Sequence, residues 1–442
     1  MYKLFFFCCS ESDTSLKNCN TQNAKIASIT EKTLIVGIDV GSETHYARAF
    51  DWRNYEYTKR PLEFSNTEAG FQTLKAWMEE LAEKHGKTAV IPGMEPTGHY
   101  WFALGKFLQN NGMKPVHVNP HHVKKSKELD DNNPNKNDRK DPKTIAALVN
   151  EGRFSYPYMP AGIYAEIRGL SNLRVQTQEE LTRIKNRLAR WFAIYFPEYK
   201  DVYGDLKAVS GRMVLKAAPL PEDIIRLGAE GVNQIWRDAK LRGAGMKRVR
   251  ILVSAAEHSV GSKEGPEAAR MELKNLPNDI DVYTSRMEEL LQRIEEKLRE
   301  IPYIDNLLAI KGIGMVTVSG FIAEVGDIER FDNPKQLQKL AGYAIVANDS
   351  GKHSGESRIS YRGRTRLRYV LYEAAVSLVG KNAGFRQIHE YYRTRKENPL
   401  KKMQSVVAAA CKVLRIFYAI LTKGVEYDPE KLPGDIRRPQ AA

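Results

Sequence analysis

The sequence feature that most constrains this chain is an apolar run, Thr33–Val40, that carries a carboxylate near its end. A run of this kind is typical of a central strand covered on both faces, and Gly37 and Gly41 flank its acid, Asp39. A charge at the end of a buried strand must be solvated, paired or bound to a metal ion. Asp39 is therefore the first candidate functional residue.

The segments after Asp39 predict a mixed domain with the element order βββαβαβα. The later strands are expected over Tyr46–Asp51, Glu56–Phe64, Thr88–Met94 and Pro115–Val118. The helices are expected over Asn66 to about Leu81, Tyr100–Asn110 and Pro142–Asn150, with a polar loop before the last one.

Three more carboxylates occupy matching places in this domain. Glu95 ends the strand that stops at Met94, and Asp138 and Asp141 stand three residues apart where the last helix begins. Each of the last two, taken alone, is more simply interpreted as a solvated loop acid. Together the four predict a site for two Mg²⁺ ions about 4 Å apart, because hard cations prefer oxygen ligands and no His or Cys cluster accompanies the acids.

Charge points to a polyanion partner. The 442 residues carry a net charge of +14, and the segment 351–402 holds 13 Lys and Arg against 4 Asp and Glu. Such clustering favours nucleic acid, although a solvated surface is the alternative. Four cysteines without ligand spacing indicate a reduced, cytosolic protein. Residues 1–30 are expected to be a disordered leader, and no membrane-spanning segment is expected.

The middle of the chain predicts long helices. Apolar residues recur at spacings of three and four over Tyr164–Tyr199 and again over Ile280–Ile301. Paired helices that join subunits into a dimer or tetramer are one interpretation, and a hairpin within one chain is the other. The region 202–279 is expected to be mostly helical, and its sequence indicates no role.

Two motifs in the last third suit phosphate binding. The segment Leu307–Val318 predicts a helix, a Gly-Ile-Gly turn and a second helix, a pattern that resembles a helix-hairpin-helix; it contains Lys311, Gly312 and Gly314. The backbone N–H groups of such a turn can hold a phosphate. The alternative is that the glycines serve tight helix packing. A Ser-, Gly- and Arg-rich segment follows. Its candidate nucleic-acid contacts are Lys352, Arg358, Arg362, Arg364, Arg366 and Arg368.

Several motifs together resemble a known family. The acids and element order are similar to the ribonuclease H-like fold of RuvC-type nucleases. The motifs Gly37–Gly41, Glu95–Trp101, Val118–Pro120 and Lys136–Asp141 resemble the DEDD transposases of bacterial insertion sequences, the insertion sequence 110 family.

This resemblance implies a DNA transposase in which Asp39, Glu95, Asp138 and Asp141 bind Mg²⁺. A serine in a second domain would form a covalent link to DNA, the two sites combining across subunits, and a non-coding guide RNA would bridge donor and target DNA. The family spacing, counted from Gly342 and from Ile359, implies that this serine is Ser350. Lys124, Lys125 and Lys127 would contact nucleic-acid backbones.

The expected organisation is a RuvC-like domain over 31–155, a helical or coiled-coil region over 160–305, a mainly helical serine transposase domain over 306–425, and a tail over 426–442. Its expected location is the bacterial cytoplasm, at the nucleoid. Three rivals remain: a RuvC-type Holliday-junction endonuclease that uses water, an actin-like or sugar-kinase ATPase, and a noncatalytic nucleic-acid scaffold.

Overall fold

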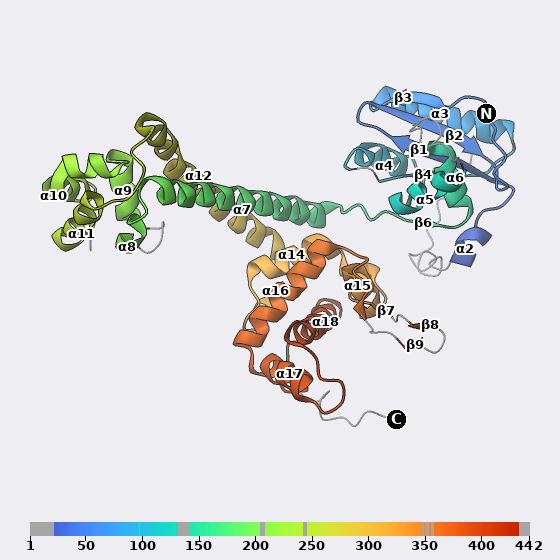
Figure 1. Cartoon of the computed structure of the whole chain (residues 1–442). Coiled ribbons are helices and arrows are strands. Elements are labelled where there is room, and N and C mark those ends of the chain that lie inside the picture. The colour runs from blue at the N-terminus through green and yellow to red at the C-terminus, as the bar shows by residue number, and fades with distance from the viewer. Residues whose placement is uncertain are drawn as a thin grey trace. The chain divides into compact units, whose positions relative to one another are not determined.

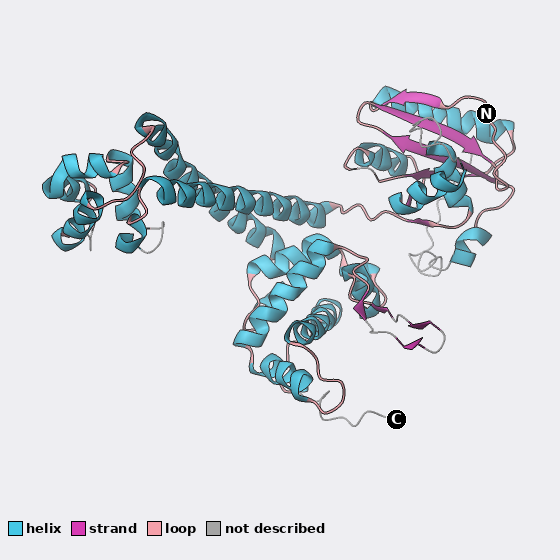
Figure 2. Cartoon of the chain, in the orientation of Figure 1, coloured by secondary structure: helices cyan, strands magenta, loops and turns pink. Residues whose placement is uncertain are grey.

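The computed structural model describes residues 22–96, 98–130, 141–203, 208–241, 245–346, 349–350, 353–354 and 358–432; the side chains of 127–130, 349–350 and 353–354 lie outside this description. The chain divides into two compact units, Met1–Met159 and Pro160–Ala442, here called unit 1 and unit 2 (Figure 1). Unit 1 is a mixed α/β domain, and unit 2 is almost entirely helical (Figure 2).

A six-stranded sheet organises unit 1. Its strands are β1 (Thr33–Val40), β2 (Thr44–Phe50), β3 (Leu62–Ser65), β4 (Ala89–Met94), β5 (Val116–Val118) and β6 (Phe154–Ser155). Their order in the sheet is β3-β2-β1-β4-β5-β6. The pairs β1–β4 and β4–β5 are parallel, and the other three are antiparallel.

Helices cover both faces of this sheet because the strand side chains alternate. Leu34 and Ile38 of β1 pack with α3 (Glu68–Lys84) and α4 (Trp101–Asn110). Ile35 points to the opposite face and packs with α6 (Asp141–Asn150). The central strand is thus buried on both sides, as its continuous apolar run predicts.

Three features of unit 1 differ from the expectations. The expected polar loop before α6 is wrong, because Pro120–Asp130 forms helix α5. Asn119 accepts a hydrogen bond from the backbone N–H of His121, and Val123 is buried, so a capped start and one apolar anchor outweigh the polar composition. The strand expected over Glu56–Phe64 is shorter in the structure, where β3 covers Leu62–Ser65. At the expected start of this strand, Glu56 forms an isolated bridge with Phe50.

Unit 1 also begins earlier than the expected boundary at residue 31. Gln22–Ala27 forms helix α2, and Ile29 packs in the core with α6. The amide of Gln22 donates to the carbonyl oxygen of Glu151 at 2.9 Å, and the Lys25 ammonium donates to that of Phe154. These contacts attach the segment 22–29 to the edge of the sheet at β6.

Two long helices, α7 (Gly162–Tyr195) and α12 (Pro266–Leu298), pack against each other within the chain. The Trp191 indole N–H of α7 donates to the Ala269 carbonyl oxygen of α12 at 3.0 Å, inside the core. The intrachain interpretation of the periodic segments is therefore confirmed. The second helix starts well before the expected Ile280, because Gly265 in a left-handed conformation and Pro266 begin it.

A small helical core lies where α7 ends and α12 begins. It includes Trp191, Phe192 and Trp236. The remaining helices of this region are α8 (Tyr199–Tyr203), α9 (Val209–Ala217), α10 (Pro221–Asp238) and α11 (Met246–Glu257). Gly228, at φ 67°, kinks α10.

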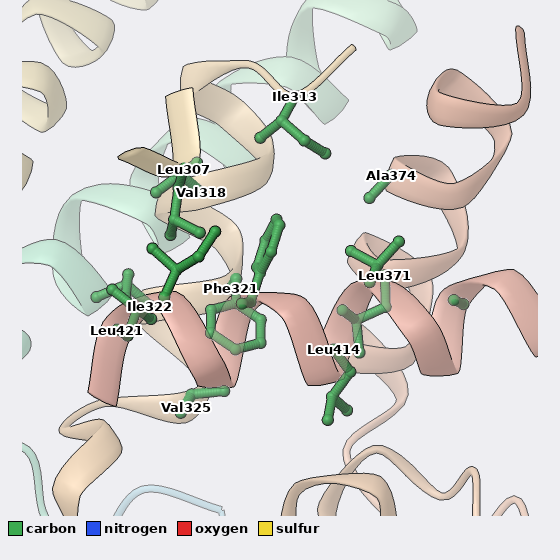
Figure 3. Close-up of a cluster of buried hydrophobic side chains, with 14 of the residues drawn as sticks. Leu307, Ile313, Val318, Phe321, Ile322, Val325, Leu371, Ala374, Leu414 and Leu421 are labelled. Atoms are coloured by element: carbon green, nitrogen blue, oxygen red, sulfur yellow. The ribbon is translucent and has the colours of Figure 1, made fainter. Parts of the chain in front are cut away.

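The largest core of unit 2 belongs to its last helices. They are α13 (Ile304–Leu308), α14 (Met315–Val325), α15 (Pro334–Ala341), α16 (Thr365–Lys381), α17 (Ala383–Thr394) and α18 (Lys402–Lys423), with a 3₁₀ turn at Ile328–Arg330. Figure 3 shows Phe321 of α14 and Leu371 of α16 beside Leu414 of α18.

Helix α18 is long and apolar enough, by length and composition alone, to cross a membrane. No such segment is expected from the sequence, and by length and composition alone that expectation is wrong. Half of its most apolar stretch is buried within unit 2, and Leu414, Phe417 and Leu421 lie in the core. Core helices of folded domains pass the same test.

Candidate active site

Asp39 and Glu95 occupy equivalent positions on neighbouring parallel strands. Ile38 of β1 is paired with Met94 of β4, and each acid is the next residue. Because side chains alternate along a strand, both acids belong to the face opposite Ile38 and Met94, which pack with α3 and α4. The two carboxylates therefore share one face and one end of the sheet.

The helix α6 lies directly on that face. A Cβ atom added to Gly37, two residues before Asp39, would stand 1.8 Å from the carbonyl oxygen of Pro142. A Cβ atom added to Gly93, two residues before Glu95, would stand 2.5 Å from Cγ2 of Val149. Only glycine lets a helix approach two strands this closely.

Asp141 is the first residue of α6 and is 9% exposed. Since Pro142 contacts the backbone beside Gly37, Asp141 is held at the same end of the sheet as Asp39. The positive end of the α6 dipole also favours an acid in the first turn. The sequence analysis placed the helix start here, and α6 begins one residue earlier than expected.

The donor set fits magnesium in its chemistry, since every candidate ligand is a carboxylate. Asp138 lies outside the described residues. Within the described part of the chain, no group of three or more His, Cys, Asp and Glu side chains is close enough to hold a metal ion. Asp39 and Glu95 nevertheless share one end and one face of the sheet, and Asp141 lies at the same end, on the helix that covers this face.

A buried histidine, which the sequence analysis did not single out, holds the turn after Asp39. His45 of β2 is fully buried, and its Nδ1 accepts the backbone N–H of Gly41 at 3.2 Å. Asn66 donates its side-chain amide to the carbonyl oxygen of Ser42. Burial lowers the pKa of His45, so the neutral ring that can accept this bond is favoured. Its signal in the sequence is an inward-facing position in an alternating strand.

The aromatic residues after Glu95 divide into two groups. Trp101 is 7% exposed and packs in the core, with its ring edge-on to His117 at 4.2 Å between centroids. His99 and Tyr100 are exposed. Packing therefore explains Trp101, whereas the exposed His99 and Tyr100 are available to shape a site.

The basic residues that follow β5 lie on a helix. Lys124 and Lys125 are exposed on α5, and the side chain of Lys127 lies outside the description. Beside this helix, an open cavity of about 590 Å³ reaches Pro96, next to Glu95, and is lined by His117, Asn119 and Arg153 among others.

Ser350 lies in unit 2, in a short hairpin of β8 (Asp349–Ser350) and β9 (His353–Ser354). Strands β7 (Ile345–Val346) and β10 (Arg358–Ile359) pair at the base of the segment that carries it. We call residues 343–364 the serine loop. Its ends cross closely, because a Cβ atom on Gly363 would stand 2.5 Å from the backbone nitrogen of Gly342.

Arg368 fastens the two ends of the serine loop. Its Nη1 donates to the carbonyl oxygens of Ala341 at 3.1 Å and of Tyr361 at 3.3 Å. The Tyr343 hydroxyl donates to the Arg368 carbonyl oxygen at 2.8 Å. The guanidinium also lies over the Tyr361 ring. A residue that the sequence analysis assigned to nucleic acid is thus bonded inside the protein.

The other predicted phosphate contacts also divide. Arg358 and Arg362 are exposed. Arg364 donates to the backbone oxygen of Glu324 at 2.6 Å, and Arg366 donates to the carbonyl oxygen of Ser171 in α7 at 2.9 Å. Lys352 lies outside the described residues.

The glycine turn before α14 packs onto α16. Gly312 has φ 107°, and its carbonyl oxygen accepts the Ser377 hydroxyl at 2.7 Å. Gly314 begins α14 with open space around it, and Lys311 is exposed. Packing therefore accounts for Gly312, whereas Gly314 is exposed and its phosphate interpretation stays a prediction.

Two family models match the chain. One, described as a transposase, matches residues 36–197, and the other, described as the IS116/IS110/IS902 transposase family, matches residues 304–393. The first match includes all four acids, and the second includes Ser350 and its arginines.

Curated proteins of insertion elements are similar over much of the chain. The 44.8 kDa protein of insertion element IS116 of Streptomyces clavuligerus is 24% identical, covering 87% of this chain and 94% of that protein. The transposase for insertion sequence element IS1111A of Coxiella burnetii is 22% identical, with 89% and 91% covered. The 42 kDa protein of IS900 of Mycobacterium paratuberculosis is 25% identical, with 65% and 73% covered.

Proposed function

Since this chain belongs to the insertion sequence 110 family of DEDD transposases and is a DNA transposase, we propose that it cuts and rejoins strands with two cooperating sites. One is the acid edge, by which we mean Asp39, Glu95, Asp138 and Asp141. The other is the hydroxyl of Ser350. The observation that carries this proposal is the shared face and matched register of Asp39 and Glu95 beside the first residue of α6.

The acid edge supports a ribonuclease H-like, RuvC-like interpretation of unit 1. Its strand order, with one acid on β1 and one after β4, suits two divalent cations held by carboxylates. Mg²⁺ bound there would polarise the scissile phosphate. The protein's own part is to fix the carboxylates by strand register and by the close contact of α6.

In the proposed reaction, the Ser350 oxygen forms a bond to phosphorus while one bond from phosphorus to a sugar oxygen breaks. The serine proton leaves to a base, and the released sugar oxygen takes up a proton. The number of phosphoester bonds is conserved, so a new strand end can reverse the step and be joined without an energy source. Water as nucleophile would lose that bond.

We further propose that a guide RNA supplies target choice and that two or four subunits assemble on the donor and target DNA. The exposed Lys124, Lys125, Arg358 and Arg362 suit backbone contacts that carry no sequence information. The exposed glycine Gly314, in a turn resembling a helix-hairpin-helix, suits the same use. The expected setting is the bacterial cytoplasm, at the nucleoid.

The test compares Asp39→Asn and Ser350→Ala in the full chain with DNA of the element ends and Mg²⁺. We expect both to abolish strand joining, and only wild type to give a covalent protein–DNA adduct that survives denaturation. A Ser350→Ala protein that still cuts would establish a water-using endonuclease. Cutting by both variants would remove both sites from the mechanism, and ATP turnover would favour the kinase-like rival.

A further inference from the structure

Three helices of unit 2 meet at a junction rich in arginine. Helix α14 packs against both α7 and α16. Arg366, in the first turn of α16, donates to the carbonyl oxygen of Ser171 and to the side-chain oxygen of Asn172, both on α7. Arg366 therefore lies across the seam between the two helices.

Two arginines come close together at this junction. Arg366 contacts the carboxylate of Glu324 of α14 at 4.0 Å, and Glu324 also contacts Arg364 at 3.5 Å. Arg174 of α7 lies near Arg366, and within the described residues no ion pair joins Arg174 to a carboxylate. Arg174 and Arg366 thus place two guanidinium groups near each other.

The environment of Arg174 makes the proximity of the two positive charges unfavourable. The side chain is half-buried, and its pKa is lowered first by burial and then by the charge of Arg366. Two like charges held close together, away from bulk water, repel each other more strongly than exposed ones do. An anion between them would remove the repulsion.

The other groups at the junction are donors too. Asn172 is exposed, and because its side-chain oxygen accepts from Arg366, its amide N–H groups can donate outward. Tyr369, which lies on α16 near Arg174, is 62% exposed. The surface therefore offers N–H and O–H groups to an acceptor that comes from solution.

We propose that Arg174 and Arg366 together bind one backbone phosphate of duplex DNA at the α7–α16 seam. The inference rests on the proposed function, since DNA is the partner that a transposase must hold. The exposed setting suits a long polymer that passes over the surface. Because α16 follows directly on the serine loop, DNA bound here would contact the helix that adjoins the segment carrying Ser350.

The test measures the affinity of the full chain for duplex DNA by fluorescence anisotropy at several salt concentrations. Arg174→Gln should weaken binding about three- to tenfold and lower the slope of log affinity against log salt by about 0.9. Arg183→Gln is the matched control, with the same charge change on the same helix at an exposed pair with Glu180. It should leave the slope unchanged.

Stability separates phosphate binding from a structural role. Without DNA, Arg174→Gln should melt at the same temperature as wild type or higher, because it removes a repulsion. A lower melting temperature, an unchanged salt slope, or a change seen with RNA and absent with DNA would each overturn the proposal. Strand joining is measured separately, so failure of the wild-type chain to join DNA would count against the proposed function alone.

Discussion

The acid edge and the serine loop are held in place in opposite ways. At the acid edge, backbone meets backbone: β1 and β4 share a register, and α6 contacts Gly37 through the carbonyl oxygen of Pro142. The serine loop is joined to its unit by short strands, two close glycines and the side chain of Arg368. The first site depends on close packing, and the second depends on a few hydrogen bonds.

This difference suits the two proposed chemistries. Carboxylates that hold cations must keep fixed positions, which a sheet covered by a helix provides. A serine that attacks one DNA strand and later releases it to another benefits from lying on a segment that only a few contacts hold to the rest of its unit. This difference predicts that substitutions of the glycines beneath α6 act through the stability of unit 1, whereas substitutions at the base of the serine loop act through local order.

The largest effect is expected for Gly37→Ala. Its Cβ atom would overlap the Pro142 carbonyl, and because the obstacle is backbone, α6 must move away from β1. We expect a loss of about 3 kcal/mol or more in the unfolding free energy of unit 1. Chemical denaturation followed by hydrogen exchange in β1 and α6 measures it.

The matched control is Gly169→Ala in α7, where, apart from the adjoining residues and the backbone of the helix itself, no heavy atom of the described residues lies within 4 Å of the added Cβ atom. There the substitution should be neutral or stabilise by about 0.5–1 kcal/mol, as expected in a helix interior. Equal stability of Gly37→Ala and wild type would show that α6 does not contact β1 in the way described.

Arg368→Met should act on the serine loop instead. The variant loses the bonds to Ala341 and Tyr361, so hydrogen exchange over 342–346 and 358–361 should rise and strand joining should fall about tenfold or more. The salt slope of DNA binding should stay unchanged, because this guanidinium is bonded internally.

Arg362→Met is the control for that variant, since Arg362 is an exposed arginine of the same loop. It should lower the salt slope by about 0.9 and leave exchange unchanged. If Arg368→Met lowered the slope and left exchange unaltered, Arg368 would be the phosphate contact that the sequence suggests.

A third prediction concerns Mg²⁺ and the acid edge. When the free Mg²⁺ concentration is about ten times the dissociation constant, the bound ion should stabilise unit 1 by about 1.4 kcal/mol and leave unit 2 unaffected. Asp39→Asn should remove this gain. Glu63→Gln changes an exposed acid on β3 of the same sheet and should retain it. A gain retained in Asp39→Asn would place the ion elsewhere.

The sequence predicts where Asp39, Glu95 and Asp141 lie in the fold, because the determinants of these positions are local. A buried strand, the register of its residues and the start of a helix are each determined by a short segment of sequence, such as Thr33–Val40 for the strand β1. The arginines were harder to assign, because Arg364, Arg366 and Arg368 differ only in which distant partner each one meets. Glu324 is 40 residues from Arg364, and no spacing rule links them. His45 was missed because the strand was expected to begin at Tyr46, whereas β2 begins at Thr44 and makes His45 an inward-facing residue.

The smallest expected effect separates the two regions by pH. Burial lowers the pKa of His117 to about 4, and its Nε2 atom is buried with no hydrogen-bond partner in the described residues. Because the folded pKa lies below the unfolded value of about 6.5, its contribution is complete above pH 6.5 and is lost as the pH falls toward 4. We expect unit 1 to lose on the order of 1 kcal/mol between pH 7 and pH 5 from this group, after allowance for screening.

Unfolding at the two pH values measures this loss. His117→Leu should reduce it, and His121→Leu, at an exposed position on α5, should not. The guanidinium of Arg368 does not titrate in this range, so the serine loop should keep its hydrogen-exchange protection while unit 1 weakens. Equal acid sensitivity of His117→Leu and wild type would show that this ring takes up its proton without strain. The loss of stability of unit 1 at low pH would then come from other groups, of which buried His45, beside the turn after Asp39, is the next to test.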